Sequence, residues 1–225
     1  MSYDDAIAAL SKDALRFVKN DSILGLGSGR AATSFVKELG IHIKKKKIRV
    51  YGVPTSLQIK IIAEQSGINI IDADQIEKID VVFDGADQID SQKNLIKGGG
   101  GALFRENTLI SAAKTVVIMA DATKFVKYFN RSVPVEVHPF ARSISKKIIE
   151  KMGGKPMLRT IDKGYPFVTE NGNIIYDSDF GTIRSPGPLA ARLRQLAGIV
   201  EVGIFTRKPD VIYKANENGK FEVLR

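Results

Sequence analysis

The chain has no cysteine and no tryptophan, and only two histidines among its 225 residues. The lack of cysteine excludes disulfides, thiolate metal sites and cysteine nucleophiles. His42 and His138 lie far apart in sequence, so we expect no metal site of the zinc type. No apolar run approaches the length that crosses a bilayer. The first 18 residues are acidic and amphipathic, unlike a secretory signal, and we therefore expect a cytoplasmic protein.

The composition is that of a globular protein, with 44% hydrophobic and 26% charged residues. A net charge of +9 raises the question of nucleic-acid binding. The lysines are dispersed, however, and the one run, Lys44–Lys47, is interpreted as a solvated connection between a helix and a strand. A positive field also attracts small phosphorylated substrates, so charge alone does not decide the partner.

Strand and helix patterns alternate along the first half of the chain, which predicts a mostly parallel sheet covered by helices on both faces. One of these helices is expected from Arg30 to Leu39, ending at Gly40. After residue 131 the pattern becomes β-α-β-β-α-β, typical of a small ferredoxin-like module, with a hairpin expected over residues 167–177. Residues 210–225 read as a second hairpin that returns to the first domain.

A first glycine cluster follows an apolar strand and precedes a helix, at Gly25–Ala32. Read from Gly27 it satisfies G-x-G-x-x-A, the dinucleotide fingerprint, but the next strand ends without the acidic residue that holds a ribose. The same turn suits a lone phosphate, because Ser28 offers a hydroxyl, Arg30 a planar fork, and the backbone its amides. The alternative is a turn that serves only tight packing, and the same turn can both pack tightly and bind a phosphate.

A second cluster, Asp84-Gly-Ala-Asp87, stands where a strand ends, at the sheet edge where open α/β proteins bind ligands. With Asp90 nearby, the carboxylates suit either magnesium or proton transfer beside a sugar, and Asp90 in particular suits a turn cap. The small side chains of Gly85 and Ala86 leave room for a substrate between Asp84 and Asp87, which favours substrate contact.

The third and most informative segment is KGGGGALFRE, from Lys97 to Glu106. Alone, such a run reads as a surface loop, but four glycines that lead into a helix also let backbone amides approach an anion. A lysine, amides and a carboxylate together suit proton abstraction beside a carbonyl, with the cation and amides holding the enediolate oxygen. Further on, Lys124 follows another strand end and could reach a substrate phosphate, although alone it reads as a solvated lysine.

Taken in order, GLGSG, DGAD, KGGGGALFRE, ADATK, PVEVHPFAR, TENGNIIYD and GIVEVGIF resemble the A-type ribose-5-phosphate isomerases, from about residue 4 onward. The resemblance implies a Rossmann-like catalytic domain over residues 1–131 and 207–225, with a smaller α/β lid over 132–206. It implies interconversion of D-ribose 5-phosphate and D-ribulose 5-phosphate in the non-oxidative pentose phosphate pathway, without a metal or cofactor. It also implies homodimers or homotetramers, and no nucleic-acid or membrane partner.

The resemblance further implies roles for single residues. Glu106 would be the base that moves the proton between C1 and C2, Asp84 would assist ring opening and hydroxyl proton transfer, and Asp87 would hold substrate hydroxyls. Lys97 would stabilise the enediolate together with backbone amides. The amides and the remaining substrate-binding positions are Gly98, Gly99, Gly100, Gly85, Ala86, Ser28, Gly29, Arg30, Ala31 and Lys124.

Three departures from the family pattern stand out. Gly29-Arg30-Ala31 replaces the usual Gly-Ser-Thr, and a lysine common in the first helix corresponds to Ile7 or Ala8. Our hypothesis is that Arg30 supplies the missing phosphate charge. Finally, Gln88 replaces a common glutamate, and Asn107 replaces a common lysine beside the base.

Two other functions fit the sequence less well than catalysis. A sugar-phosphate-sensing domain of a repressor shares a similar fold, but it is expected to follow roughly 60 residues of DNA-binding helices. Only about 20 residues precede the first glycine strand, and Glu106, Asp84 and Lys97 are all retained, so we expect an enzyme. A dinucleotide-dependent oxidoreductase is disfavoured by the missing acidic residue.

Overall fold

The computed structural model describes residues 2–225, which group by their contacts into two compact units. The first unit contains the residues up to Ala86, Arg105–Lys124 and Arg207–Arg225. The second unit contains Asp87–Phe104 and Phe125–Thr206. The division into a catalytic domain and a lid that the sequence suggests stays a prediction.

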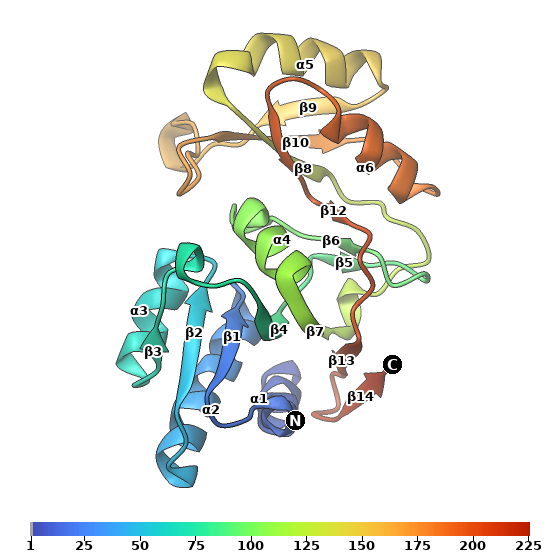
Figure 1. Ribbon diagram of the computed structural model, residues 1–225. Coiled ribbons are helices and arrows are strands. Elements are labelled where there is room, and N and C mark those ends of the chain that lie inside the picture. The colour runs from blue at the N-terminus through green and yellow to red at the C-terminus, as the bar shows by residue number, and fades with distance from the viewer. Residues whose placement is uncertain (1) are drawn as a thin grey trace. The chain divides into compact units, whose positions relative to one another are not determined.

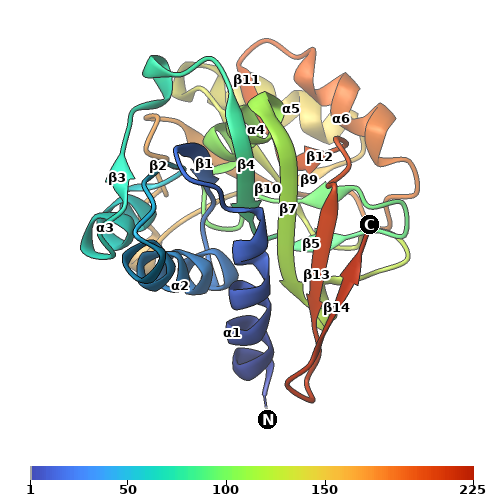
Figure 2. The same ribbon diagram turned by 60° about the horizontal axis from the view of Figure 1, so that its bottom comes forward.

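A seven-stranded sheet forms the centre of the first unit, in the order β3-β2-β1-β4-β7-β13-β14 (Figure 2). Its strands are β1 (Ser22–Leu26), β2 (Val50–Pro54), β3 (Asn69–Ile70), β4 (Ile79–Asp84), β7 (Ala113–Asp121), β13 (Val211–Ala215) and β14 (Phe221–Leu224). All neighbouring pairs are parallel except β13 with β14. The predicted parallel sheet is therefore confirmed, and the C-terminal hairpin does return to it, because β13 pairs with β7.

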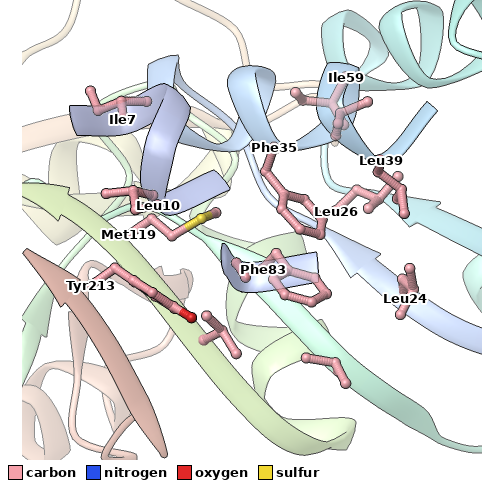
Figure 3. Close-up of a cluster of buried hydrophobic side chains, with 14 of the residues drawn as sticks. Ile7, Leu10, Leu24, Leu26, Phe35, Leu39, Ile59, Phe83, Met119 and Tyr213 are labelled. Carbon is pink, nitrogen blue, oxygen red and sulfur yellow. The ribbon is translucent and has the colours of Figure 1, made fainter. Parts of the chain in front are cut away.

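Helices cover both faces of this sheet. They are α1 (Tyr3–Ala14), α2 (Arg30–Lys46), α3 (Leu57–Gln65) and α4 (Leu103–Ala112). The first three helices bury their apolar side chains with Leu24, Leu26 and Phe83 on one face, where the rings of Phe35 and Phe83 stack 3.9 Å apart (Figure 3). Helix α4 packs on the opposite face, since a Cβ at Gly25 would meet Leu109 of α4 at 3.5 Å.

The predicted end of α2 at Gly40 is wrong, because the helix continues to Lys46. Gly40 is needed for close packing instead: a Cβ there would lie 2.6 Å from the carbonyl oxygen of Ser66, at the end of α3. Most of the lysine run therefore forms the last turn of α2, where cations complement the helix dipole. No helix within residues 2–225 is both long and apolar enough to cross a membrane.

The second unit is built on a four-stranded antiparallel sheet in the order β11-β8-β10-β9. Its strands are β8 (Val133–Val137), β9 (Lys155–Leu158), β10 (Ile174–Asp179) and β11 (Ile199–Val202). Figure 1 shows the two helices of this unit, α5 (Arg142–Lys151) and α6 (Pro186–Arg194). Their apolar side chains are buried against one face of the sheet. The chain order β8-α5-β9-β10-α6-β11 confirms the predicted β-α-β-β-α-β module.

Two details of the second unit differ from the sequence prediction. Strand β10 pairs with β8 and β9, whereas the residues before the Glu-Asn-Gly-Asn turn form only an isolated bridge between Val168 and Ile174. The hairpin expected over 167–177 is therefore reduced to that bridge. A small sheet of two-residue strands, which had not been predicted, joins β5 (Gln88–Ile89), β6 (Leu95–Ile96) and β12 (Ile204–Phe205).

Candidate functional site

The carboxyl ends of four parallel strands meet at one edge of the first unit's sheet. In register, Leu26 of β1 lies opposite both Pro54 of β2 and Phe83 of β4, and Asp84 lies opposite Ile118 of β7. The loops that follow these strands carry the Ser28 turn, the DGAD segment and Lys124. Ser28, Asp84 and Lys124, all of the first unit, thus lie at the edge where open α/β sheets bind ligands.

Asp84 and Gly27 fit together at this edge. The Asp84 side chain is fully buried, and its Oδ1 accepts a hydrogen bond of 2.7 Å from the amide of Gly85. A Cβ at Gly27 would lie only 2.1 Å from Oδ1 and from Cγ of Asp84. The carboxylate therefore occupies the space that any side chain at position 27 would need. This explains Gly27 without a dinucleotide.

Ser28 belongs to a cluster of three hydroxyls. Its Oγ lies 2.8 Å from Oγ1 of Thr55 and 3.0 Å from Oγ of Ser56, the residue that caps the N-terminus of α3. Thr55 and Ser56 were not predicted as site residues. They could have been predicted from their position directly after β2, because residues that follow neighbouring parallel strands lie at the same edge of the sheet.

Arg30 is the exposed first residue of α2 and is engaged by two carboxylates. Its guanidinium lies 3.3 Å from Asp121 and 3.4 Å from Asp4. Gly29 before it has a φ of 91°, a conformation that favours glycine. Ala31 is half-buried, and Lys124 is half-buried in a short 3₁₀ turn (Ala122–Lys124) after β7.

Glu106 lies in the first turn of α4 and is buried, with 5% of its surface exposed. Helix α4 runs directly into β7 without a loop. Arg207 binds the junction: its Nη1 donates to the carbonyls of Ile110 and Ser111, and its Nη2 donates to that of Ala113. These bonds satisfy carbonyls that a helix end leaves without partners.

Lys97 begins the glycine run in the second unit and is also buried, with 3% exposed. Its amide donates to the carbonyl of Gly203 at 3.0 Å, and a Cβ at Gly203 would lie 2.4 Å from the Lys97 carbonyl oxygen. Close backbone contact therefore fixes the start of the run.

Asp87 and Arg159 hold the glycines that follow. The amide of Gly99 donates to Oδ2 of Asp87 at 2.7 Å. Nη1 of Arg159 donates to the carbonyls of Gly98 and Gly99 at 2.8 and 3.1 Å. One of the three predicted enediolate donors, the Gly99 amide, is thus bound to Asp87 in this structure, and Arg159 is a contact that the sequence did not reveal.

Asp90 and Gln88, which follow the DGAD segment, both form hydrogen bonds with neighbouring residues. Asp90 takes the turn-capping role, because its oxygens accept from the amides of Gln92 and Asn94 and from the side chain of Asn94. Gln88 exchanges two hydrogen bonds with Asn130. Across residues 2–225, no three acidic or histidine side chains gather as metal ligands.

Comparison with known proteins gives consistent matches. A family model described as ribose 5-phosphate isomerase A (phosphoriboisomerase A) matches residues 51–219. The ribose-5-phosphate isomerase A of Methanosarcina acetivorans is 38% identical over 208 residues, 92% of this chain and 88% of that protein. The Archaeoglobus fulgidus protein of the same name is 42% identical over 203 residues, 88% of this chain and 89% of that protein.

Solved structures agree with these sequence matches. Ribose 5-phosphate isomerase A from Methanocaldococcus jannaschii matches with a TM-score of 0.91 at 33% identity, over 99% of this chain and 98% of that one. A D-ribose-5-phosphate isomerase in complex with phospho-erythronic acid matches with a TM-score of 0.92 at 35% identity, over 99% and 97% of the two chains.

Proposed function

This chain belongs to the ribose 5-phosphate isomerase A family, and from that premise we propose that it interconverts D-ribose 5-phosphate and D-ribulose 5-phosphate. The family resemblance inferred from its motifs is confirmed. The chain is an aldose–ketose isomerase, and none of the relatives named above supports the non-catalytic sensing domain. The reaction belongs to the non-oxidative pentose phosphate pathway.

Proton transfer between two neighbouring carbons is the central step of the proposed mechanism. After ring opening, Glu106 removes the proton from C2 of the aldose, and the electron pair forms the C1–C2 double bond of an enediolate. The same carboxyl group then returns the proton to C1, while the hydroxyl proton moves from O2 to O1. Asp84 assists ring opening and this hydroxyl transfer. No oxidant or reductant is consumed, since one carbon is reduced as the other is oxidised.

Negative charge on the enediolate oxygen needs a partner, and we assign this role to Lys97 and the amides of the glycine run. Asp87 holds substrate hydroxyls. One solved structure of the family contains phospho-erythronic acid, whose carboxylate is planar and anionic like an enediolate. A relative thus binds an anion of the kind that a site stabilising an enediolate has to accept.

The observation that carries the proposal is the burial of Asp84, Lys97 and Glu106, which are 0%, 3% and 5% exposed. Aspartate, lysine and glutamate side chains are rarely buried so completely. Charges that are removed from water interact more strongly, so a buried lysine stabilises an enediolate better than a solvated one would.

The phosphate is assigned to the Ser28 turn and to Lys124 at the sheet edge. We retain the hypothesis that Arg30 adds a positive charge there, although Asp121 and Asp4 already neutralise part of it. Replacing Arg30 with alanine should raise KM about tenfold, as expected for the loss of a charged contact of about 1.4 kcal/mol. A KM within about twofold of wild type would refute this role for Arg30.

A homodimer or homotetramer in the cytoplasm is proposed as the working form. Large apolar side chains exposed on the second unit support assembly: Phe140, Ile144, Met157, Ile161, Tyr165 and Val168. Those that lie in a contact with another copy would be covered there.

Conversion of ribose 5-phosphate in the presence of EDTA tests the mechanism, with Glu106→Gln beside wild type. We expect wild-type activity to survive EDTA, and kcat of Glu106→Gln to fall by about 10²–10⁴-fold with little change in KM. Glu38→Gln is the matched control, since Glu38 is a partly buried glutamate of α2 outside the proposed site. Activity that disappears with EDTA, or a Glu106→Gln enzyme as fast as wild type, would refute the mechanism.

A further inference from the structure

Arg159 follows β9, and only 14% of its side chain is exposed. Its Nε and Nη2 donate to the two oxygens of Asp177 at 2.8 and 2.5 Å, and its Nη1 donates to Gly98 and Gly99. A bidentate, largely buried pair of this kind is geometrically specific, unlike a solvated surface ion pair.

The bonds from Nη1 constrain two successive peptide groups. In a trans peptide the N–H points away from the C=O of the same planar group. Holding the carbonyls of Gly98 and Gly99 therefore sets the direction of the N–H groups of Gly99 and Gly100. The first of these meets Asp87 at 2.7 Å, which is consistent with such an orientation.

Glycine is the residue that most needs this constraint, because its backbone is the freest of all. Gly98 and Gly101 have φ values of 97° and 83°, so the run is folded as a turn, closed by a 3.0 Å bond from the Gly101 amide to the Gly98 carbonyl. Phe167 packs beside both Arg159 and the end of the glycine run. The Arg159 guanidinium lies 5.7 Å from the centre of its ring, and a Cβ at Gly101 would lie 2.5 Å from the ring atoms.

Asp177 determines what kind of influence Arg159 exerts. Because the carboxylate pairs with the guanidinium, the glycine amides receive little net positive charge from it. The contribution of Arg159 is therefore geometric, and it depends on a planar fork that reaches carboxylate and carbonyls at once. Lysine cannot reproduce that fork.

We propose that Arg159, held by Asp177, is a positioning residue for the isomerisation: it fixes the glycine run, keeping the Gly99 amide against Asp87 and setting the direction of the Gly100 amide for the developing enediolate. The proposal rests on the proposed function of the same run. Small displacements of a positioning element can cost up to about 10²-fold in rate. We therefore expect kcat to fall at least tenfold in Arg159→Ala, Arg159→Lys and Asp177→Asn, with KM within about threefold.

The test combines steady-state kinetics with amide hydrogen exchange of residues 98–101 in the wild type and the three variants. Faster exchange of these amides in each variant is expected, because the turn is no longer held. Arg49→Ala is the control: it removes an exposed arginine that pairs with Asp21 in the first unit, and it should change neither kcat nor this exchange.

The outcomes separate the two proposals. An inactive wild type would overturn the proposed function, while exchange would still decide whether Arg159 orders the run. An Arg159→Lys enzyme with wild-type kcat and wild-type exchange would overturn the positioning role, even if Arg159→Ala failed to fold. A loss confined to KM would also overturn it, since it would place Arg159 in substrate binding.

Discussion

Gly27 and Asp84 depend on each other although Gly27 follows β1 and Asp84 ends β4. The carboxylate of Asp84 fills the space beside Cα of Gly27, so the glycine is required by its neighbour. A buried carboxylate aimed by packing in this way has few alternative positions. The orientation of the Asp84 carboxylate thus depends partly on the absence of a side chain at Gly27.

Replacement of Gly27 with alanine should therefore displace Asp84. A Cβ 2.1 Å from a carboxylate oxygen cannot be accommodated without movement of one group. We expect kcat to fall at least tenfold, about 1.4 kcal/mol of lost transition-state stabilisation. Gly187→Ala is the control, since the nearest atom to a Cβ there, Cγ2 of Thr206, is 3.9 Å away. Equal activity of the two variants would contradict the dependence.

Helix α4 shows how an element of only ten residues can hold a buried glutamate in a fixed place. It presents Glu106 in its first turn and passes directly into β7 at its other end. With no loop to provide caps, the carbonyls at that end depend on Arg207, which comes from a distant part of the sequence. Arg207 therefore holds α4 at the end opposite Glu106, the proposed base.

Loss of this tie is expected to destabilise the first unit. Arg207→Ala would leave carbonyls of Ile110, Ser111 and Ala113 without their charged donor. Hydrogen bonds to charged groups contribute about 1.5–3 kcal/mol, so we expect the free energy of unfolding in urea to fall by about 2 kcal/mol. Lys37→Ala, an exposed position on α2, should change it by less than about 0.5 kcal/mol. A similar small change in Arg207→Ala would show that water replaces the arginine.

At the scale of the whole molecule, the exposed apolar side chains of the second unit predict assembly. Phe140 is 91% exposed, and Phe140→Asp should place a charge in the contact between copies. We expect light scattering to report a dimer or tetramer for wild type and a smaller species for this variant. Ile41→Asp is the control, because Ile41 is also exposed, at 61%, but lies on α2 of the first unit. A monomeric wild type would contradict the prediction.

The fold was predictable wherever the signal was local. Alternating strand and helix patterns identified the parallel sheet, and residues placed directly after strands had to meet at one edge. Gly40 led to a wrong helix end, because the group that requires a glycine there, the carbonyl of Ser66, follows another helix, α3. The strands β5, β6 and β12 have two residues each and are too short to show a period.

The candidate site divides in the same way. The carboxylates of the DGAD segment and the lysine, glycines and glutamate of the KGGGG segment indicate a chemistry from the sequence alone, so Asp84, Lys97 and Glu106 are predicted site residues. Arg159 could not, because its acceptors Gly98 and Gly99 lie 60 or 61 positions away and nothing near Arg159 marks it. Contacts of this length follow from the tertiary structure alone.

The position of β13 and β14 also bears on how the protein is made. Residues 207–225 supply two strands of the first unit's sheet, whereas every residue of the second unit precedes them in the chain. During synthesis on the ribosome the second unit can therefore complete its core first. Until β13 arrives, β7 presents an open edge, the kind of strand that pairs with foreign chains. The first unit therefore begins at the N-terminus but is completed last. It is the unit that stays exposed to misassembly for longer.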